Sequence, residues 1–279
     1  MLREIAHFLK LNGFESDLLI RKGQEVVFVQ CVVGDPSSVR CIVPVSVCAG
    51  SLTEAQKQAD EMAELLETLE SEEIEPIVIT EDRWRRQGEM MKARLLAHLE
   101  VFTSLYARNC EVRKIDKETA AEFLDKNHSY GDAACRYRYG MYLRRPSRDG
   151  KLQAGSLVAV ATFSNARKWV KGEKTIRSYE WTRYASLPGV RISGGMGKVL
   201  KAFIKDVQPD DIMSYADLEW SEGNVYEQLG FMLEGRKEPV MFVVDEEWRR
   251  FPVKPGMTGD RFFTNQGSNK YRLKLTQYE

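Results

Sequence analysis

The chain has 279 residues, of which 43% are hydrophobic and 29% charged, and its 41 basic residues balance its 41 acidic residues. This composition excludes a disordered chain and predicts a folded protein with a sizeable core. The neutral total charge excludes a field that would attract nucleic acid over the whole surface, although local patches can still do so. No apolar run approaches the roughly 18–20 residues that span a bilayer, so we expect no membrane partner.

The cysteines are odd in number, are scattered and lack CxxC spacing, which argues against a disulfide framework and a thiolate zinc site. They are Cys31, Cys41, Cys48, Cys110 and Cys135. With only three histidines a multi-histidine metal site is also excluded, and we predict no metal. The first 14 residues are charged throughout and resemble an amphipathic helix more than a signal peptide. Reduced thiols, together with a first segment that resembles an amphipathic helix, predict a cytoplasmic protein.

The first hundred residues have the pattern of a small α/β domain. A helix is expected up to Gly13, followed by β-rich runs at 25–33 and 39–47 that are separated by a turn at Gly34–Ser37. A long helix should begin at Ser51 or Thr53, because apolar residues then recur on one face. They are Ala55, Ala59, Met62, Leu65, Leu66 and Leu69. A short buried strand at 77–80 and a helix at about 83–98 complete this domain, 1–100.

A linker is expected at 101–114, and a second domain at 115–279. Its elements alternate in the order helix, three strands, helix, strand, helix, strands, which predicts an α/β fold with a mixed sheet and flanking helices. The helices are expected at 117–126, 198–207 and 224–229, and the strands at 136–144, 156–164, 176–185, 211–216, 239–244 and 269–275.

A glycine-rich link joins a strand to a helix in the second domain. Gly194, Gly195 and Gly197 stand where backbone N–H groups and the helix dipole can meet an anion such as a pyrophosphate. A tight turn that packs helix against strand explains the same glycines equally well. The spacing matches neither a Walker loop nor a dinucleotide fingerprint.

The run Asn224–Phe231, NVYEQLGF, follows this loop by about 30 residues. Together the two motifs resemble the GNAT superfamily of CoA-dependent N-acyltransferases, whose cofactor loop reads Q/R-x-x-G-x-G/A and whose next helix commonly ends N…Y-x-x-L-G-F. The chain departs from the loop pattern at Ile192, where the family has glutamine or arginine, and has Arg191 one position earlier. The resemblance covers about 160 residues and implies a GNAT-like mixed sheet.

The resemblance also implies roles for individual residues. Acetyl-CoA or another acyl-CoA would be bound by the loop and by the start of the next helix. These residues are Arg191, Ile192, Ser193, Gly194, Gly195, Met196, Gly197 and Asn224. Tyr226 would protonate the leaving thiolate, and Glu180, on the strand before the loop, would act as the base. A packed aromatic ring and an exposed or ion-paired strand carboxylate are the alternative interpretations of these two residues.

A longer set of motifs from Trp84 onward, including EFLDKNHSYG, LVAVATFSNAR and SYADLEWSEGNVYEQLGF, resembles a group of phage and mobile-element proteins. In that group a GNAT-like domain follows an endonuclease-like unit, and the phage DNA-modification protein Mom has a related fold. The resemblance implies a possible nucleic-acid substrate. The first domain lacks the E-x-K pair of metal nucleases, and Asp17 and Glu25 are its only acids near the strands, so a degenerate unit is expected.

Two further features allow a functional or a structural interpretation. His128 lies in a loop where its pKa near neutrality would suit a base, although a hydrogen-bonded loop histidine is equally ordinary. The strand at 136–144 alternates arginine with apolar residues, which is typical of a half-buried strand but also leaves cations for phosphate groups. The candidate nucleic-acid contacts are Arg136, Arg138, Arg144 and Arg145.

Three functions therefore stay open at this stage. The chain could be an acyl-CoA-dependent N-acyltransferase, a nucleic-acid-modifying or nucleic-acid-binding protein of the Mom type, or a non-catalytic binding protein with the same fold. The sequence does not distinguish them, because fold and activity are separable.

Overall fold

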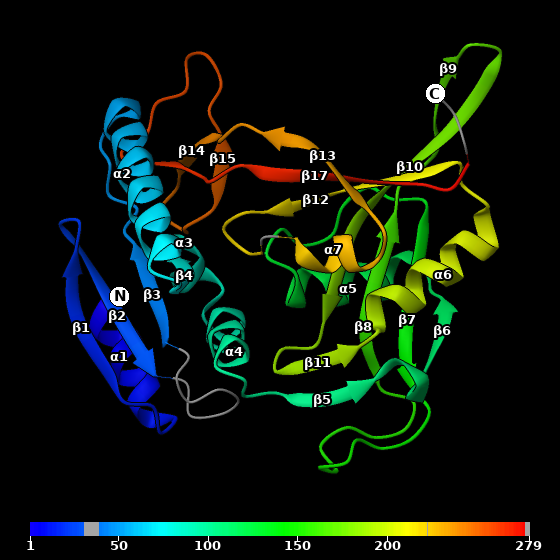
Figure 1. Cartoon of the computed structure of the whole chain (residues 1–279), viewed down its shortest axis with the longest axis horizontal. Coiled ribbons are helices and arrows are strands. Elements are labelled where there is room, and N and C mark those ends of the chain that lie inside the picture. Colours follow the sequence, from blue (N-terminus) through cyan, green and yellow to red (C-terminus); the bar gives the residue numbers. More distant parts are fainter. Residues whose placement is uncertain (31–38, 222, 277–279) are drawn as a thin grey trace. The chain divides into compact units, whose positions relative to one another are not determined.

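The computed structural model describes residues 1–30, 39–221 and 223–276, so Cys31 and the turn predicted at Gly34–Ser37 lie outside the described residues. The chain forms two compact units, and each is assembled from separate stretches (Figure 1). Unit 1 contains residues 1–101, 217–220 and 237–268, and unit 2 contains 102–216, 221–236 and 269–279.

Unit 1 is built on a four-stranded sheet in the order β1-β2-β3-β4, in which only the β3–β4 pair is parallel. In chain order its elements are α1 (Leu2–Leu11), β1 (Ser16–Arg21), β2 (Gln24–Gln30), β3 (Val39–Val45), α2 (Leu52–Ser71), β4 (Glu75–Thr80), α3 (Glu81–Arg86) and α4 (Gly88–His98). The predicted start of the long helix is confirmed, because the Ser51 hydroxyl accepts the Glu54 N–H at 3.2 Å.

Helices cover both faces of this sheet because successive strand residues point to opposite sides. Val27 packs on one face with Ile5 of α1 and Leu95 of α4. Its neighbour Val26 packs on the other face with Met62 of α2.

A second, three-stranded sheet of unit 1 comes from residues distant in sequence: β14 (Met241–Val244), β15 (Arg250–Pro252) and β16 (Phe262–Thr264), in the order β15-β14-β16. Phe262 forms an isolated bridge with Ala49 and packs with Ala55 of α2. Residues 237–268 therefore belong with unit 1, whereas the sequence analysis assigned them to the domain at 115–279. Their apolar side chains pack against α2 and against Val45 and Val47 at the end of β3, contacts that no local pattern in the sequence indicates.

Unit 2 is built on a mixed sheet in the order β13-β17-β12-β10-β8-β7-β6, with β9 paired only to β10 among the described residues. Its elements are β5 (Thr103–Tyr106), a 3-10 turn at 107–109, β6 (Cys110–Lys114), α5 (Lys117–Asn127), β7 (Tyr137–Leu143), β8 (Leu157–Phe163), β9 (Arg167–Lys171), β10 (Lys174–Ser186), β11 (Val190–Ser193), α6 (Gly195–Val207), β12 (Asp211–Asp217), α7 (Asn224–Gln228), β13 (Met232–Lys237) and β17 (Ser268–Lys274). The predicted α/β class with a mixed sheet and flanking helices is confirmed.

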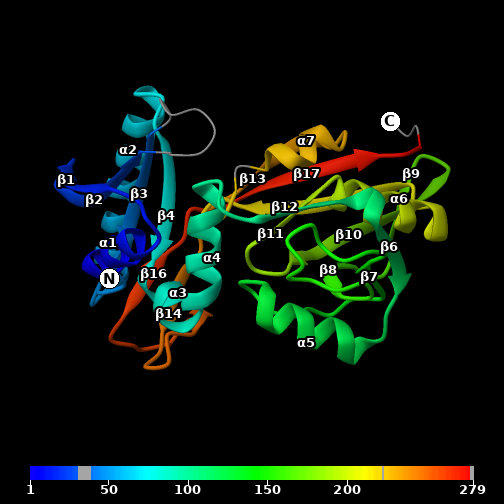
Figure 2. The same ribbon diagram turned by 90° about the horizontal axis from the view of Figure 1, so that it is seen from below.

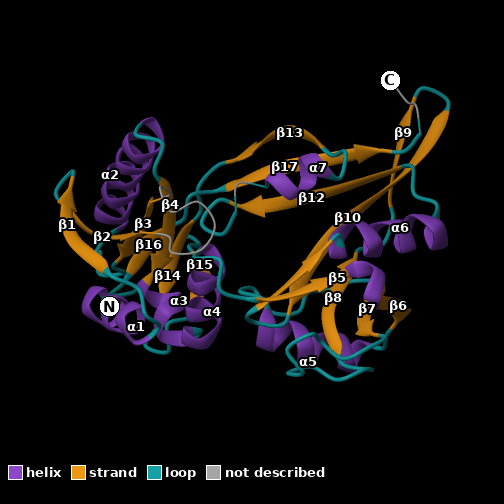
Figure 3. Ribbon diagram, turned by 60° about the horizontal axis from the view of Figure 1, so that its bottom comes forward, coloured by secondary structure: helices purple, strands orange, loops and turns teal. Residues whose placement is uncertain are grey.

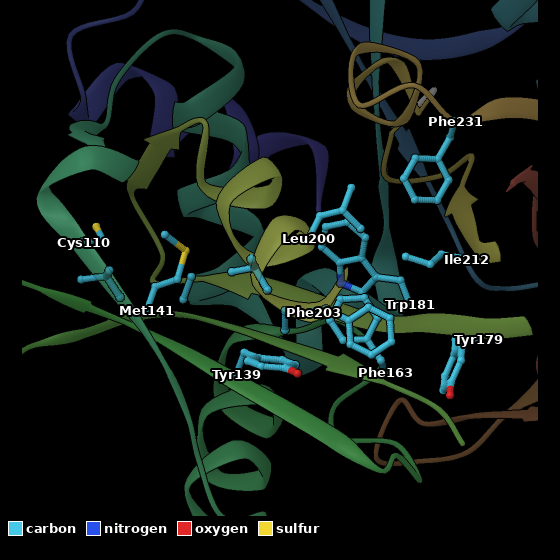
Figure 4. Close-up of a cluster of buried hydrophobic side chains, with 14 of the residues drawn as sticks. Cys110, Tyr139, Met141, Phe163, Tyr179, Trp181, Leu200, Phe203, Ile212 and Phe231 are labelled. Carbon is cyan, nitrogen blue, oxygen red and sulfur yellow. The ribbon is translucent and has the colours of Figure 1, made fainter. Parts of the chain in front are cut away.

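The two faces of this sheet carry different helices, α6 and α7 on one side and α5 on the other (Figure 2). The α6 side is aromatic. Phe203 of α6 stacks on Phe163 of β8 with ring centroids 3.8 Å apart and planes within 1°, and Trp181 of β10 stacks on Phe163 at 5.2 Å (Figure 4). This core fixes α6 and β10, the two elements that carry the glycine loop and Glu180.

Two predicted segments differ in the structure. The helix expected at 83–98 is divided into α3 and α4, which meet at Gln87, and the linker expected at 101–114 contains β5, a 3-10 turn and β6. β5 pairs in parallel with β11, so residues after 101 are tied into unit 2 by backbone hydrogen bonds. None of the helices in the described residues is both long and apolar enough to cross a membrane.

Candidate functional site

The glycine loop at the start of α6 is held by close packing. Gly194 has a φ of 73°, in the left-handed region that favours glycine. A Cβ at Gly195 would lie 2.8 Å from the Tyr184 hydroxyl, and a Cβ at Gly197 would lie 3.1 Å from Leu229 of the segment after α7. The packing interpretation of these glycines is therefore confirmed, and their small size also brings the α6 N-terminus close to α7.

The same loop leaves an anion-binding geometry open. Among the described residues no side chain caps the N-terminus of α6, so the first-turn N–H groups lack the usual side-chain acceptor. Ser193 is exposed beside this end, and Met196 is half-buried against the core. A ligand with negatively charged oxygens would satisfy these N–H groups and would be favoured by the helix dipole.

Strand β11 explains why Ile192 stands where the GNAT pattern has a polar residue. Ile192 pairs with Leu105 of β5 and packs against the aromatic core, whereas its neighbour Arg191 is exposed, with its guanidinium 5.1 Å from the Phe102 ring. Because successive side chains of a strand point to opposite faces, Ile192 packs inward and Arg191 lies at the surface.

Tyr226 of α7 is held in the core of unit 2. Its ring stacks on Tyr271 at 5.3 Å, and its hydroxyl lies 2.9 Å from Ser214 Oγ. Ser214 Oγ is also 3.0 Å from the Trp181 carbonyl, which can only accept. Since a serine has one hydroxyl proton, Ser214 donates to this carbonyl and the Tyr226 hydroxyl donates to Ser214. Burial raises the pKa of Tyr226, so the phenol stays protonated near neutral pH.

Tyr226 lies where two parallel strands separate. β10 and β12 pair only over Ser178–Glu180 and Asp211–Met213, and each strand then continues on its own path (Figure 3). The Trp181 carbonyl, the next group along β10, bonds to the Ser214 side chain instead of a backbone N–H of β12. The Tyr226 hydroxyl therefore ends at the gap between the two strands.

Glu180 belongs to the opposite face of the sheet. It stands between Tyr179 and Trp181, which both pack in the aromatic core on the α6 side, so its side chain points toward the α5 side. It is half-buried, and its backbone N–H donates to Ser164 Oγ at 2.9 Å. Tyr226 and Glu180 thus occupy the two sides of the strand gap.

Arg183 links Glu180 to the loop that carries His128. A β-bulge between Trp181 and Arg183 changes the register against β8, and the Arg183 Nε donates to the Gly131 carbonyl at 3.0 Å. Burial lowers the pKa of Arg183, while the attraction of Glu180 acts in the opposite direction. The Glu180 carboxylate is therefore near enough to attract the Arg183 guanidinium.

His128 ends α5, and its ring is engaged locally. Its Nδ1 accepts the Tyr130 N–H at 3.1 Å, which leaves the proton of the neutral ring on Nε2. In this tautomer Nε2 cannot accept a proton, so the geometry favours a loop-positioning role for His128.

The remaining predicted residues are dispersed. Asn224 begins α7 and is exposed, next to Gly223, where a Cβ would lie 2.7 Å from the Tyr271 hydroxyl. Arg136 precedes β7, and its N–H bonds to the Phe163 carbonyl at one end of the sheet. Arg144 and Arg145 follow β7 at its other end and are exposed, and Arg138 is half-buried with a bond to the Cys135 carbonyl. The four arginines do not form one patch.

The acids that a nuclease would need are also apart. Asp17 of β1 pairs with Phe28, and Glu25 of β2 pairs with Ile20, so the two exposed carboxylates stand at different rungs of the ladder. Within the described residues no group of three or more His, Cys, Asp or Glu side chains has the arrangement of a metal site.

The sequence analysis did not identify Ser214, Tyr184 or Tyr271 as parts of this site. Ser214 could have been noticed as a polar residue inside the buried run DIMSYA, because buried hydroxyls need partners. Nothing in the sequence indicates that Tyr184 lies against Gly195 or that Tyr271 stacks on Tyr226, since both contacts depend on tertiary packing.

No family model matches this chain, and no curated protein matches it. Solved structures similar to it include yncA from Salmonella typhimurium, assigned as an acetyltransferase and bound to its cofactor acetyl-CoA, with 13% identity over 61% of this chain and 96% of that one and a TM-score of 0.37. The spermidine/spermine N-acetyltransferase SpeG from Vibrio cholerae has 12% identity over 60% and 94%, with a TM-score of 0.37. A ribosomal-protein-S5-alanine acetyltransferase from Vibrio fischeri has 10% identity over 61% and 96%, with a TM-score of 0.36.

Proposed function

We propose that the chain is an acyl-CoA-dependent N-acyltransferase of the GNAT type, and that acetyl-CoA or another acyl-CoA is its cofactor. One observation carries the proposal. The uncapped N-terminus of α6 contacts the end of α7 through Gly197 and Leu229, and α7 directs the Tyr226 hydroxyl to the gap between β10 and β12. A candidate anion site and a half-buried proton donor thus stand on the same side of the sheet.

The residues present fit such a cofactor. The N–H groups of the loop at 191–197 would donate to the oxygens of its pyrophosphate, with Arg191 as a nearby cation and Asn224 at the start of α7. Bound there, an acyl-CoA would supply the acyl group as an activated thioester at the strand gap. The acceptor amine would approach from the α5 side, where Glu180 would take up its proton.

Tyr226 would act on the leaving sulfur mainly as a hydrogen-bond donor. An ordinary thiol has a pKa of about 8.5, below the raised pKa of Tyr226. Full proton transfer to a thiolate is therefore unfavourable, whereas a hydrogen bond to the developing charge stabilises the transition state. Ser214 can turn its hydroxyl from the Trp181 carbonyl toward Tyr226 and stabilise negative charge on the phenol oxygen.

The test is isothermal titration with acetyl-CoA of the wild type, Ser193→Glu and Ser193→Gln. Ser193 is exposed, so neither substitution disturbs the core, unlike a change at buried Gly195. We expect micromolar binding by the wild type and Ser193→Gln, and binding at least about tenfold weaker for Ser193→Glu, whose carboxylate repels the pyrophosphate. Absence of wild-type binding, or equal binding by both variants, would contradict the proposal.

The same titration separates two competing proposals. A non-catalytic protein with this fold would bind no acyl-CoA, and a nucleic-acid-modifying protein of the Mom type would act through Glu180, Tyr226 and His128 on a nucleobase. The Tyr130 N–H donates to His128 Nδ1, so His128 is not free to act as the Mom-type proposal requires. Of the three proposals, this favours the acyltransferase. For unit 1 we propose a degenerate endonuclease-like or binding role, supported by the separation of Asp17 from Glu25. The free thiols of Cys41, Cys48, Cys110 and Cys135 fit a cytoplasmic location.

A further inference from the structure

A two-stranded ribbon extends from the sheet of unit 2 and has no part in the proposed acyl transfer. It consists of β9 and the first residues of β10, paired in antiparallel register from Arg167–Ser178 to Lys171–Lys174 (Figure 1). Below we call residues 167–178 the basic ribbon. In the described part of the chain β9 has no second strand neighbour, and β10 meets β12 only from Ser178 onward.

The basic ribbon carries an excess of positive charge. Residues 167–178 include five basic side chains, at positions 167, 168, 171, 174 and 177, against the single acid Glu173. Arg167, Lys168 and Lys174 are exposed, and within the described residues none of them has a carboxylate at salt-bridge distance. Arg177 has such a partner, Asp210, at 3.5 Å.

The strand register places like charges against each other. Lys168 stands directly opposite Arg177, on the ribbon face that also carries exposed Val170 and Thr175. Like charges at directly opposed positions destabilise a strand pair. Asp210 offsets the charge of Arg177, but no described carboxylate lies at salt-bridge distance from Lys168, so an external polyanion is the partner that would relieve the remaining repulsion.

The face contains more than charge. Val170 is 73% exposed, and Trp169, on the other face opposite buried Ile176, is 37% exposed. Water alone does not stabilise exposed apolar side chains on a charged hairpin. They give the ribbon a surface that can contact the apolar edges of bases as well as phosphates.

We propose that the basic ribbon is a binding element for double-stranded DNA. A ribbon of five residue pairs is about 16 Å long, and the major groove of B-form DNA, about 12 Å wide, admits a two-stranded ribbon. The deep, narrow major groove of A-form RNA does not admit one. This proposal is independent of acyl-CoA binding. It makes the basic ribbon, and not the arginines after β7, the principal nucleic-acid contact.

The experiment measures fluorescence anisotropy of a 20-base-pair DNA duplex with the full chain, without CoA, over a series of salt concentrations. Three proteins are compared: the wild type, Lys168→Ala/Lys174→Ala in the ribbon, and Lys117→Ala/Lys126→Ala as the matched control. The control removes two exposed cations from α5. Each lost phosphate contact reduces the slope of log K against log salt by about 0.9.

The ribbon double variant should bind at least tenfold more weakly at low salt, with a slope reduced by about 2, while the control keeps the wild-type slope. A duplex RNA of the same sequence should bind more weakly than the DNA. The proposal is overturned if the wild type does not bind the DNA duplex, if both double variants lose the same affinity, or if the RNA duplex or vesicles of phosphatidylcholine and phosphatidylserine bind as well as the DNA. Because this experiment contains no CoA, its result does not decide the outcome of the acetyl-CoA titration, and the two proposals can fail separately.

Discussion

The cores of the two units are stabilised by different kinds of contact. In unit 2 the aromatic rings of Phe163, Trp181 and Phe203 stack around α6, and the Tyr226 hydroxyl is bonded to the buried Ser214. Unit 1 contains a buried ionic cluster beside the aliphatic side chains that pack on its sheet. Arg250 forms a bidentate pair with Asp82 and a 2.7 Å bond to Glu219; both carboxylates are buried, and the Arg250 side chain is 9% exposed.

The ionic cluster ties three distant stretches of the chain into unit 1. Arg83 of α3 binds Asp217 at 2.9 Å and Glu219 at 3.1 Å, and the Arg94 guanidinium binds the Glu219 and Trp220 carbonyls. Dispersion contacts degrade gradually when a core changes, whereas a buried ion left without its partner keeps its full desolvation cost. The difference teaches that the aromatic core around α6 should tolerate repacking and the ionic cluster of unit 1 should not.

The largest effect should come from Arg250→Ala. The substitution leaves Asp82 and one bond of Glu219 unpaired in the core, and we expect the free energy of unfolding to fall by about 3–5 kcal/mol. Burial alone would raise the pKa of Asp82, but the bonds to Arg250 lower it overall, so that this carboxyl is charged and needs its partner. Urea denaturation followed by circular dichroism measures the loss.

Arg249→Ala is the matched control, because the neighbouring arginine forms only half-exposed pairs with Asp245 and Glu247. It should cost less than about 1 kcal/mol. Equal losses for the two variants would mean that the cluster is no more important to unit 1 than a surface pair.

Tyr226→Phe tests whether the site chemistry can be separated from the aromatic packing of unit 2. The ring can keep its stack on Tyr271, and Ser214 keeps its bond to the Trp181 carbonyl. We therefore expect kcat with acetyl-CoA and a productive amine acceptor to fall about 100-fold, with KM for acetyl-CoA unchanged. Steady-state kinetics and a thermal melt measure both properties, and a fall in Tm of more than a few degrees would show that the hydroxyl is structural.

Phe203→Leu should have the smallest effect. A smaller apolar side chain can repack against Phe163, so we expect a loss of about 1–2 kcal/mol in unfolding free energy with acetyl-CoA affinity retained. Denaturant titration gives the first quantity and calorimetry the second. A loss as large as that of Arg250→Ala would remove the contrast between an adaptable aromatic core and an intolerant ionic one.

Most element positions could be predicted because local patterns determine them. The Ser51 cap, the helix at 117–126 and the strands around 136–144 and 156–164 follow from caps and from alternation of apolar residues, and the structure has them within a few residues. β9 was missed because RKWVK has no apolar alternation and becomes a strand only by pairing with β10. The break at Gln87 was missed because the apolar pattern continues across it.

The sequence by itself determined the α/β class of the chain, the glycine loop before α6 and the presence of Tyr226 in a helix after β12, because each depends on residues close together in the chain. Only the tertiary structure decided that residues 237–268 belong to unit 1, that Tyr184 and Leu229 require Gly195 and Gly197, and that Ser214 orients the Tyr226 hydroxyl. The reason is physical. Burial, strand order and the partner of a buried hydroxyl arise from contacts between residues far apart in sequence, and no local periodicity encodes them.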